Sequence, residues 1–155
     1  MFLPLLLDSS ILGKILRPDL DANKPVSAAI LRLQRDPKFR VYIPAITDYE
    51  LRRKLLHLEL QRHQPRKWVR KALIDLDELV SADYIPLTTE TLRLAARIWA
   101  QTRAKGQLRA PEDGLDVDVI LAAQARQSGG KIITTNEKHF LSIADVFDWT
   151  PFQPS

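Results

Sequence analysis

Apolar residues occur in two kinds of segment that alternate along the chain. Short, nearly uninterrupted apolar runs are typical of strands covered on both faces of a sheet, and they lie at residues 2–8, 39–44, 84–87, 131–135 and 146–149. Longer segments with apolar residues at helical spacing predict helices at residues 9–16, 24–36, 45–63, 66–80, 88–106 and 115–130. Residues 107–114 are expected to form a loop. Because Pro4 has no N–H to donate, pairing of the first strand is expected to begin at Leu5.

Strands separated by helices in a chain of 155 residues indicate an α/β protein. We expect a three-layer α/β/α sandwich with a mostly parallel central sheet, formed by residues 1–155 as a single domain. Ligands of such sheets bind beyond the carboxyl ends of the strands. Polar residues at those ends are therefore the first candidates for a functional site.

Composition narrows the class of protein further. The chain contains no cysteine, which excludes disulfides and thiolate metal sites and fits a reducing, cytoplasmic setting. The first apolar run lacks a basic flank and stops at Asp8, unlike a signal peptide, and no stretch is long and apolar enough to span a bilayer. The net charge of +4 is weak evidence for an anionic partner.

Oxygen-bearing side chains gather at the predicted junctions between strands and helices. Asp8 follows the first strand, Glu50 lies early in the helix after the second, and Asn136 follows the strand at 131–135. Asp116 and Asp118 open the helix that precedes that strand. Several acids at one sheet edge repel one another unless a cation lies among them. Hard oxygen ligands without cysteine favour Mg²⁺ or Mn²⁺.

Each of these residues also has an ordinary structural role open to it. Asp8 is suited to cap the helix that starts at Ser9, and Thr47-x-x-Glu50 has the spacing of a capping box. Asp116 lies where a capping Asp is common, and Asn136 is a natural N-cap for the residues after it. The functional interpretation depends on all of the junctions being taken together.

Four segments resemble, in order, the four motif regions of PIN-domain nucleases, and most closely the VapC-type toxins of bacterial toxin–antitoxin pairs. They are LLLDSSIL, PAITDYELRRKLL, LDVDVILAAQA and IITTNEKHF. The positions that match the family's acids are Asp8, Glu50 and Asp118, and the fourth position carries Asn136 rather than Asp. An Asn side chain offers a carbonyl oxygen but no charge, which lowers the expected metal affinity.

The resemblance implies a metal-dependent endoribonuclease that inhibits translation, forms a homodimer and is occluded by a small cognate antitoxin. The catalytic residues it implies are Asp8, Glu50, Asp118 and Asn136. The metal ligands it implies are Asp8, Asp118 and Glu50, with Asp116 as an additional acid beside them. The candidates for contact with the RNA substrate are Ser9, Arg52, Arg53 and Thr134.

Helix geometry separates the two acids of LDVDV. Residues two apart on a helix point about 200° away from each other. Asp116 and Asp118 therefore cannot both face one metal ion from regular helical positions. Asp118 matches the family's third acid and has the small Ala122 one turn along, so we expect Asp118 to be the ligand and Asp116 the helix cap.

Several other features have ordinary interpretations beside functional ones. Basic residues that could hold phosphates are Arg52, Arg53, Lys54, Arg62, Arg66, Lys67, Arg70, Lys71, Arg103, Lys105 and Arg109, although charge runs are usually solvated faces. The three histidines, His57, His63 and His139, lack the spacing of metal ligands. The three tryptophans, Trp68, Trp99 and Trp149, are expected in the core or at an interface.

Two other functions remain open at this point. One is a non-catalytic nucleic-acid- or antitoxin-binding module on the same fold, which the intact acids disfavour and Asn136 leaves possible. The other is a phosphoryl-transfer enzyme with an aspartate nucleophile. Those enzymes commonly carry Asp-x-Asp after the first strand, and this chain has Asp8-Ser9-Ser10 instead.

Overall fold

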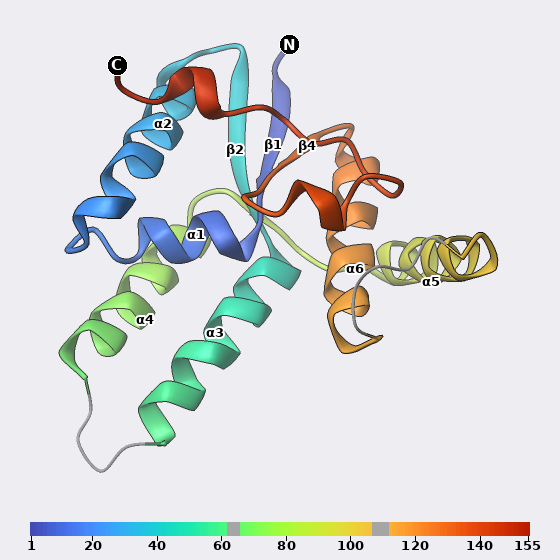
Figure 1. Cartoon of the computed structure of the whole chain (residues 1–155), viewed down its shortest axis with the longest axis horizontal. Helices are drawn as coiled ribbons and strands as arrows, with labels where there is room; N and C mark the ends of the chain where they lie inside the picture. Colours follow the sequence, from blue (N-terminus) through green and yellow to red (C-terminus); the bar gives the residue numbers. More distant parts are fainter. Residues whose placement is uncertain (62–65, 107–111) are drawn as a thin grey trace.

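A parallel sheet lies at the centre of the computed structural model, which describes residues 1–61, 66–106 and 112–155 (Figure 1). Arg62, His63 and Arg109 lie outside these ranges. Within them the sheet has four strands in the order β3-β2-β1-β4. The strands are β1 (Leu3–Leu7), β2 (Phe39–Pro44), β3 (Tyr84–Ile85) and β4 (Lys131–Ile133). All three pairings are parallel, which confirms the predicted α/β class.

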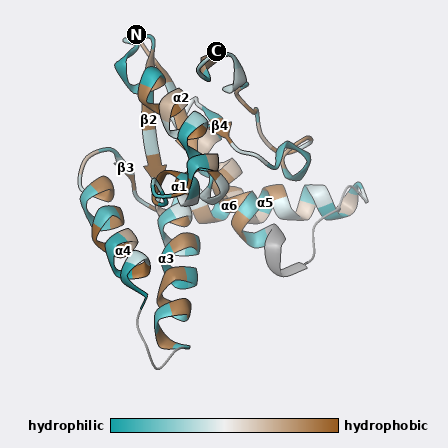
Figure 2. Cartoon of the chain, turned by 60° about the vertical axis from the view of Figure 1, so that its left-hand side comes forward, coloured by the Kyte–Doolittle hydropathy of each residue, from teal (hydrophilic) through white to brown (hydrophobic). Residues whose placement is uncertain are grey.

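Helices cover both faces of this sheet. They are α1 (Ser9–Ile15), α2 (Lys24–Arg35), α3 (Ala45–Leu60), α4 (Lys67–Val80), α5 (Thr89–Ala104) and α6 (Glu112–Ser128). Leu5 and Leu7 pack in a core with α1 to α4, whereas Leu6 packs in a second core with α5 and α6. Successive strand residues point to opposite faces, so β1 is apolar throughout because it supplies both cores. In Figure 2, α3 and α4 alternate teal and brown residues, as expected of helices with one buried side.

The first strand pairs earlier than the sequence suggested. The N–H of Leu3 donates to the carbonyl of Lys38 at 2.8 Å, so the ladder with β2 begins before Leu5. Pro4 is tolerated because β4 pairs with β1 only from Leu5 onward. The missing N–H of Pro4 therefore leaves no ladder bond unmade on that side.

Other boundaries also differ from the prediction. The strand expected at 146–149 is reduced to a single bridge between Val146 and Ile132. Strand β3 ends at Ile85, before Pro86, which cannot donate to a ladder. Helix α6 begins at Glu112, inside the segment expected to be a loop. None of the helices in the described ranges is long and apolar enough to cross a membrane.

Between α6 and β4, the backbone at Gly130 lies close to β1. A Cβ atom at this position would lie 2.6 Å from the carbonyl oxygen of Pro4 and 2.8 Å from Cδ1 of Leu6. Only glycine therefore lets β4 start beside β1 without displacing its backbone. Gly13, inside α1, is different, because a Cβ there would meet Cδ1 of Leu51 at an ordinary 3.7 Å.

We predict opposite effects for alanine at these two glycines. Gly130→Ala should lower the free energy of unfolding by about 1–3 kcal/mol, since overpacking displaces β1. Gly13→Ala should raise it by about 0.5–1 kcal/mol, since alanine restricts the unfolded chain and favours the helix. Urea denaturation followed by circular dichroism measures both. Equal effects of the two substitutions would contradict the close approach at Gly130.

Candidate active site

Asp8 occupies the turn between β1 and α1, at the carboxyl edge of the sheet. Its backbone N–H donates to the carbonyl of Ile133 at 2.9 Å, which ties the turn to the end of β4. Oδ1 accepts from the N–H of Ser9 at 2.8 Å, so Asp8 is the N-cap of α1, as its position suggested. Oδ2 accepts from the hydroxyls of Thr134 at 2.7 Å and Ser10 at 3.1 Å. The carboxylate of Asp8 therefore caps α1 with one oxygen and accepts two side-chain hydrogen bonds with the other.

Glu50 reaches the same edge from α3. The expected capping box is wrong, because α3 starts at Ala45, directly after Pro44, and its first turn has no side-chain cap. Thr47 instead lies inside the helix and donates its hydroxyl to the carbonyl of Leu7 at 2.7 Å, joining α3 to the end of β1. Glu50 is thereby free of a capping role, and its Oε1 accepts a hydrogen bond from the Ser9 hydroxyl.

Asp118 completes a group of three carboxylates. It is 8% exposed on α6. Burial, followed by the negative charges of Asp8 and Glu50, raises the pKa of Asp118 to about 7. Asp8, in the turn after β1, and Glu50, on α3, therefore lie close enough to Asp118 for their charges to affect it.

His139 is a neighbour of Asp118 that the sequence did not single out. Its Nδ1 lies 3.5 Å from Oδ2 of Asp118, and its side chain is half exposed. His139 lies in a short 3₁₀ turn, Glu137–His139, that follows the strand beside β1. The sequence could have pointed to His139 only through its place in the segment directly after β4, at the carboxyl edge of the sheet.

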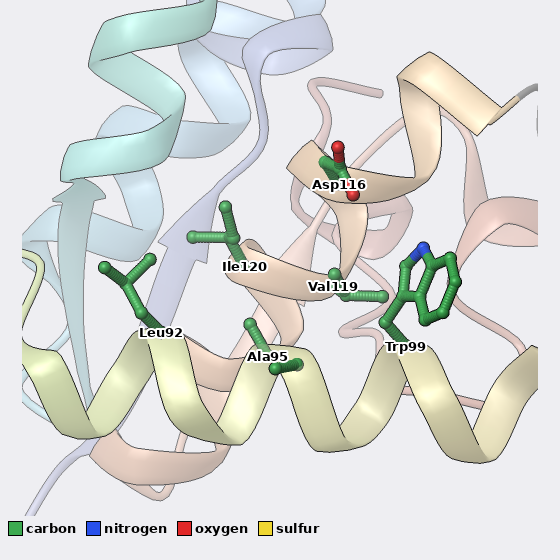
Figure 3. A pocket seen from close by; sticks show the side chains of 7 residues that line it. Leu92, Ala95, Trp99, Asp116, Val119 and Ile120 are labelled. Atoms are coloured by element: carbon green, nitrogen blue, oxygen red, sulfur yellow. The ribbon is translucent and has the colours of Figure 1, made fainter.

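Asp116 lies outside the group formed by Asp8, Glu50 and Asp118. Helix α6 begins at Glu112, so Asp116 is in its second turn and the predicted capping role is wrong. The side chain is exposed and lines an apolar groove between α5 and α6, beside Trp99 and Val119 (Figure 3). The groups that raise the pKa of Asp118 are Asp8 and Glu50, and Asp116 is not among them. This placement follows the half-turn separation expected of residues two apart.

Thr134 and Asn136 have unequal roles in the segment after β4. Thr134 is buried, and its hydroxyl links Asp8 to the N–H of Asn136, which donates to it at 2.9 Å. Asn136 occupies the predicted N-cap position of the following turn, but its exposed side chain makes no capping bond there. Its amide lies at the site edge without a structural task in the turn.

The basic residues after Glu50 differ in how firmly they are held. Arg52 donates to Asp48 at 2.9 Å and to Asp77 at 2.7 Å, which ties α3 to α4. Arg53 is exposed, with its guanidinium 5.2 Å from the ring centre of Tyr49. Of these two predicted substrate contacts, Arg52 is occupied by ion pairs within the fold, whereas Arg53 reaches into solvent.

The donor chemistry of the cluster suits a hard divalent cation. The described residues form no group of three or more His, Asp or Glu side chains already placed to hold a metal ion. Asp8 and Glu50 instead accept hydrogen bonds from serine and threonine hydroxyls. However, three carboxylates lie near one another in a partly buried site, where burial and the charges of Asp8 and Glu50 raise the pKa of Asp118. Such a group of oxygen donors fits Mg²⁺ or Mn²⁺.

Comparison with known proteins agrees with this arrangement. A family model of the PIN domain matches residues 5–146. The chain belongs to the PIN domain family. The matched range includes all four segments on which the resemblance was based, and with them Asp8, Glu50, Asp118 and Asn136. Comparison with curated protein sequences gives no match.

Solved structures share the fold of this PIN domain over nearly its whole length. FitAcB from Neisseria gonorrhoeae is 22% identical with a TM-score of 0.66, covering 94% of this chain and 97% of that one. VapBC2 from Rickettsia felis, bound to a promoter DNA fragment, is 16% identical with a TM-score of 0.66, covering 94% and 96%. VapC20 from Mycobacterium tuberculosis, a sarcin-ricin loop cleaving toxin, is 13% identical with a TM-score of 0.59, covering 93% and 99%. At these identities the likeness concerns the fold.

The raised pKa of Asp118 predicts how the metal-free PIN domain responds to pH. Between about pH 4 and pH 7 the folded protein keeps a proton on Asp118 that the unfolded chain has lost, so stability falls as the pH rises through this range. Asp118→Asn should remove this loss and stabilise the protein at pH 8 by roughly 2–4 kcal/mol, with little effect at pH 4.

Denaturation in EDTA at both pH values measures this effect. Asp116→Asn, which removes an exposed carboxylate outside the cluster, is the matched control and should behave like the wild type. A gain at pH 8 that is the same for both variants would contradict the assignment of Asp118 to a repulsive cluster.

Proposed function

We propose that this PIN domain, residues 1–155 acting as one domain, is a metal-dependent endoribonuclease and the toxin of a toxin–antitoxin pair. The observation that carries the proposal is the convergence of Asp8, Glu50 and Asp118 at the carboxyl edge of the sheet, with the pKa of Asp118 raised to about 7. The cations beside the cluster lie at its exposed edge, where Nζ of Lys54 is 3.8 Å from Oε1 of Glu50 and Nδ1 of His139 is 3.5 Å from Oδ2 of Asp118. Such a site is suited to a cation and an anionic substrate.

Each residue has a distinct task in this mechanism. Asp8, Glu50 and Asp118 hold the divalent cation, Mg²⁺ or Mn²⁺, which when bound would activate a water molecule and neutralise the phosphodiester. The hydroxyls of Ser9 and Thr134, already bonded to Glu50 and Asp8, orient these carboxylates.

Two further residues face the substrate rather than the cation. Asn136 offers an uncharged amide at the exposed rim, where it can hydrogen-bond the RNA. Arg53, exposed on α3, can hold a phosphate at the edge of the site.

RNA as the substrate and a toxin's role draw support from the structural neighbours. VapC20 is described as a toxin that cleaves the sarcin-ricin loop, and VapBC2 as a complex bound to a fragment of its promoter. Their identities to this chain are low, so the support concerns the fold on which such activity occurs. The basic balance of the chain, with a net charge of +4, favours an anionic substrate.

Cleavage should require both the metal and Asp118. Purified protein should cut single-stranded or hairpin RNA with Mg²⁺ or Mn²⁺ and lose this activity in excess EDTA. Asp118→Asn should lower the cleavage rate by more than about 100-fold. It changes a proposed metal ligand itself, and changes to the residues behind metal ligands typically cost about 10–100-fold. Asp116→Asn, two residues away on the opposite side of α6, should keep most of the activity.

Gel assays with labelled RNA measure cleavage by the wild type, Asp118→Asn and Asp116→Asn in parallel over a Mn²⁺ titration. Cleavage that persists in EDTA would rule out the metal mechanism. An inactive Asp116→Asn with an active Asp118→Asn would reverse the assignment of the two acids. RNA binding without cleavage by the wild type would favour the non-catalytic module, for which the uncharged Asn136 is the supporting feature.

We further propose a homodimer in the cytoplasm with a small antitoxin as partner. Several neighbours are complexes of paired proteins, among them VapBC2 and VapBC-1. The apolar groove between α5 and α6 supports self-association, because Leu92 is 49% exposed there beside Trp99 and Ile120. Exposed apolar surface of this kind often marks an interaction site.

Leu92→Arg should therefore turn a dimer into a monomer. Light scattering coupled to gel filtration measures the mass, and Leu141→Arg, at a residue 69% exposed outside the groove, is the matched control. Co-expression with the short reading frame beside its gene should yield a co-purifying complex. A wild type that is monomeric at high concentration would contradict the dimer.

A further inference from the structure

The C-terminal segment lies beyond the family match, which ends at residue 146, yet it is firmly anchored on the fold. The N–H of Phe147 donates to the carbonyl of Ile132 at 2.8 Å, beside the end of β4. The Phe147 and Phe152 rings pack on Phe39 with centroid distances of 5.3 and 5.9 Å. In Figure 1 the red segment returns over the sheet to α2, where Arg32 donates to the carbonyl of Phe152 at 3.3 Å. Both ends of residues 147–152 are therefore held.

Trp149, in the middle of this segment, contacts the site indirectly. It is 8% exposed, and its indole N–H donates to the carbonyl of Thr134 at 3.2 Å. Thr134 lies one residue past the end of β4, where regular pairing has stopped. Its hydroxyl donates to Oδ2 of Asp8 at 2.7 Å. A continuous chain of contacts thus runs from the indole through Thr134 to the carboxylate.

We propose that Trp149 is a positioning residue for Asp8, acting through Thr134. This inference rests on the proposed function, in which Asp8 holds the cation. A metal site needs its ligands held by the residues behind them. The Asp8 carboxylate is fixed on one side by its own helix, through the N–H of Ser9. The indole fixes the opposite side by holding the Thr134 main chain, so that the hydroxyl stays directed at Oδ2.

Trp149→Phe tests this because it removes the N–H donor and keeps most of the packing. We expect the Mn²⁺ dissociation constant, measured from free Mn²⁺ by electron paramagnetic resonance, to rise about 10-fold, the lower end for changes behind metal ligands. The kcat for RNA should fall by a similar factor with KM unchanged. Thr134→Val, which removes the hydroxyl, should give the same defects.

The double variant separates positioning from general stability. If Trp149 acts through Thr134, then Trp149→Phe should add no more than about 2-fold in the Thr134→Val background, since coupled residues are not additive. Trp68→Phe, a partly buried indole on α4 packed against Arg17, is the matched control and should leave Mn²⁺ affinity at the wild-type value. Two results would overturn the proposal. One is a double variant in which the losses of Mn²⁺ affinity from the two single substitutions multiply, and the other is an Mn²⁺ affinity of Trp149→Phe equal to that of Trp68→Phe.

A measurement on the wild type alone guards against a variant that fails to fold. The indole N–H of Trp149 should exchange with solvent at least about 10-fold more slowly in NMR spectra than that of Trp68, since it is buried and hydrogen-bonded. Equal exchange rates would overturn the proposal. If the wild type binds Mn²⁺ but cleaves no RNA, the proposed function fails, whereas the Mn²⁺ and exchange measurements still decide the role of Trp149.

Discussion

The burial of Asp118 near the carboxylates of Asp8 and Glu50 is the constraint on which the rest of the site depends. Asp8, Glu50 and Asp118 come from three separate elements, and folding brings them together at a cost in electrostatic free energy. The two apolar cores on either side of β1 oppose this cost, since Leu5 and Leu7 anchor one layer and Leu6 the other. A sheet held from both faces keeps its carboxyl edge rigid while the charges repel.

The groups that hydrogen-bond to Asp8 and Glu50 are mainly hydroxyls, and the exposed Lys54 lies 3.8 Å from Oε1 of Glu50 at the edge of the cluster. Hydroxyls of Ser9, Ser10 and Thr134 donate to Glu50 or Asp8, and a hydroxyl contributes a hydrogen bond but no net charge. Arg52, on α3, is instead bound to Asp48 and Asp77. An arginine within the cluster would pair with a carboxylate and take the place of a cation. The ion pairs of Arg52 keep it away and fasten α3 to α4 at the same time.

The sequence indicated those candidate site residues that can be recognised from their position in a single strand or helix. Asp8, Glu50 and Asp118 could be picked out as candidates because each lies at a fixed place relative to a strand end or a helix turn. Helix period indicated that Asp118 and Asp116 point apart, and the family resemblance with Ala122 favoured Asp118. Contacts between distant parts of the chain left no such signal. Thr47 looked like half of a capping box, but a bond to Leu7, 40 residues away, decides its role. The bond from Trp149 to Thr134 likewise depends on how the C-terminal segment returns across the sheet.

The Asn at position 136 is consistent with this charge balance. A fourth carboxylate at the exposed rim would add to the negative charges of Asp8 and Glu50, which, after burial, raise the pKa of Asp118 to about 7. In the proposed nuclease, three ionised acids with one divalent cation would leave a net charge of one negative unit, and a fourth acid would leave two. Because the proposed RNA substrate is itself negative, the smaller excess would lower the electrostatic barrier to its approach. An amide at this position gives up some attraction for the cation and in return reduces repulsion of the substrate.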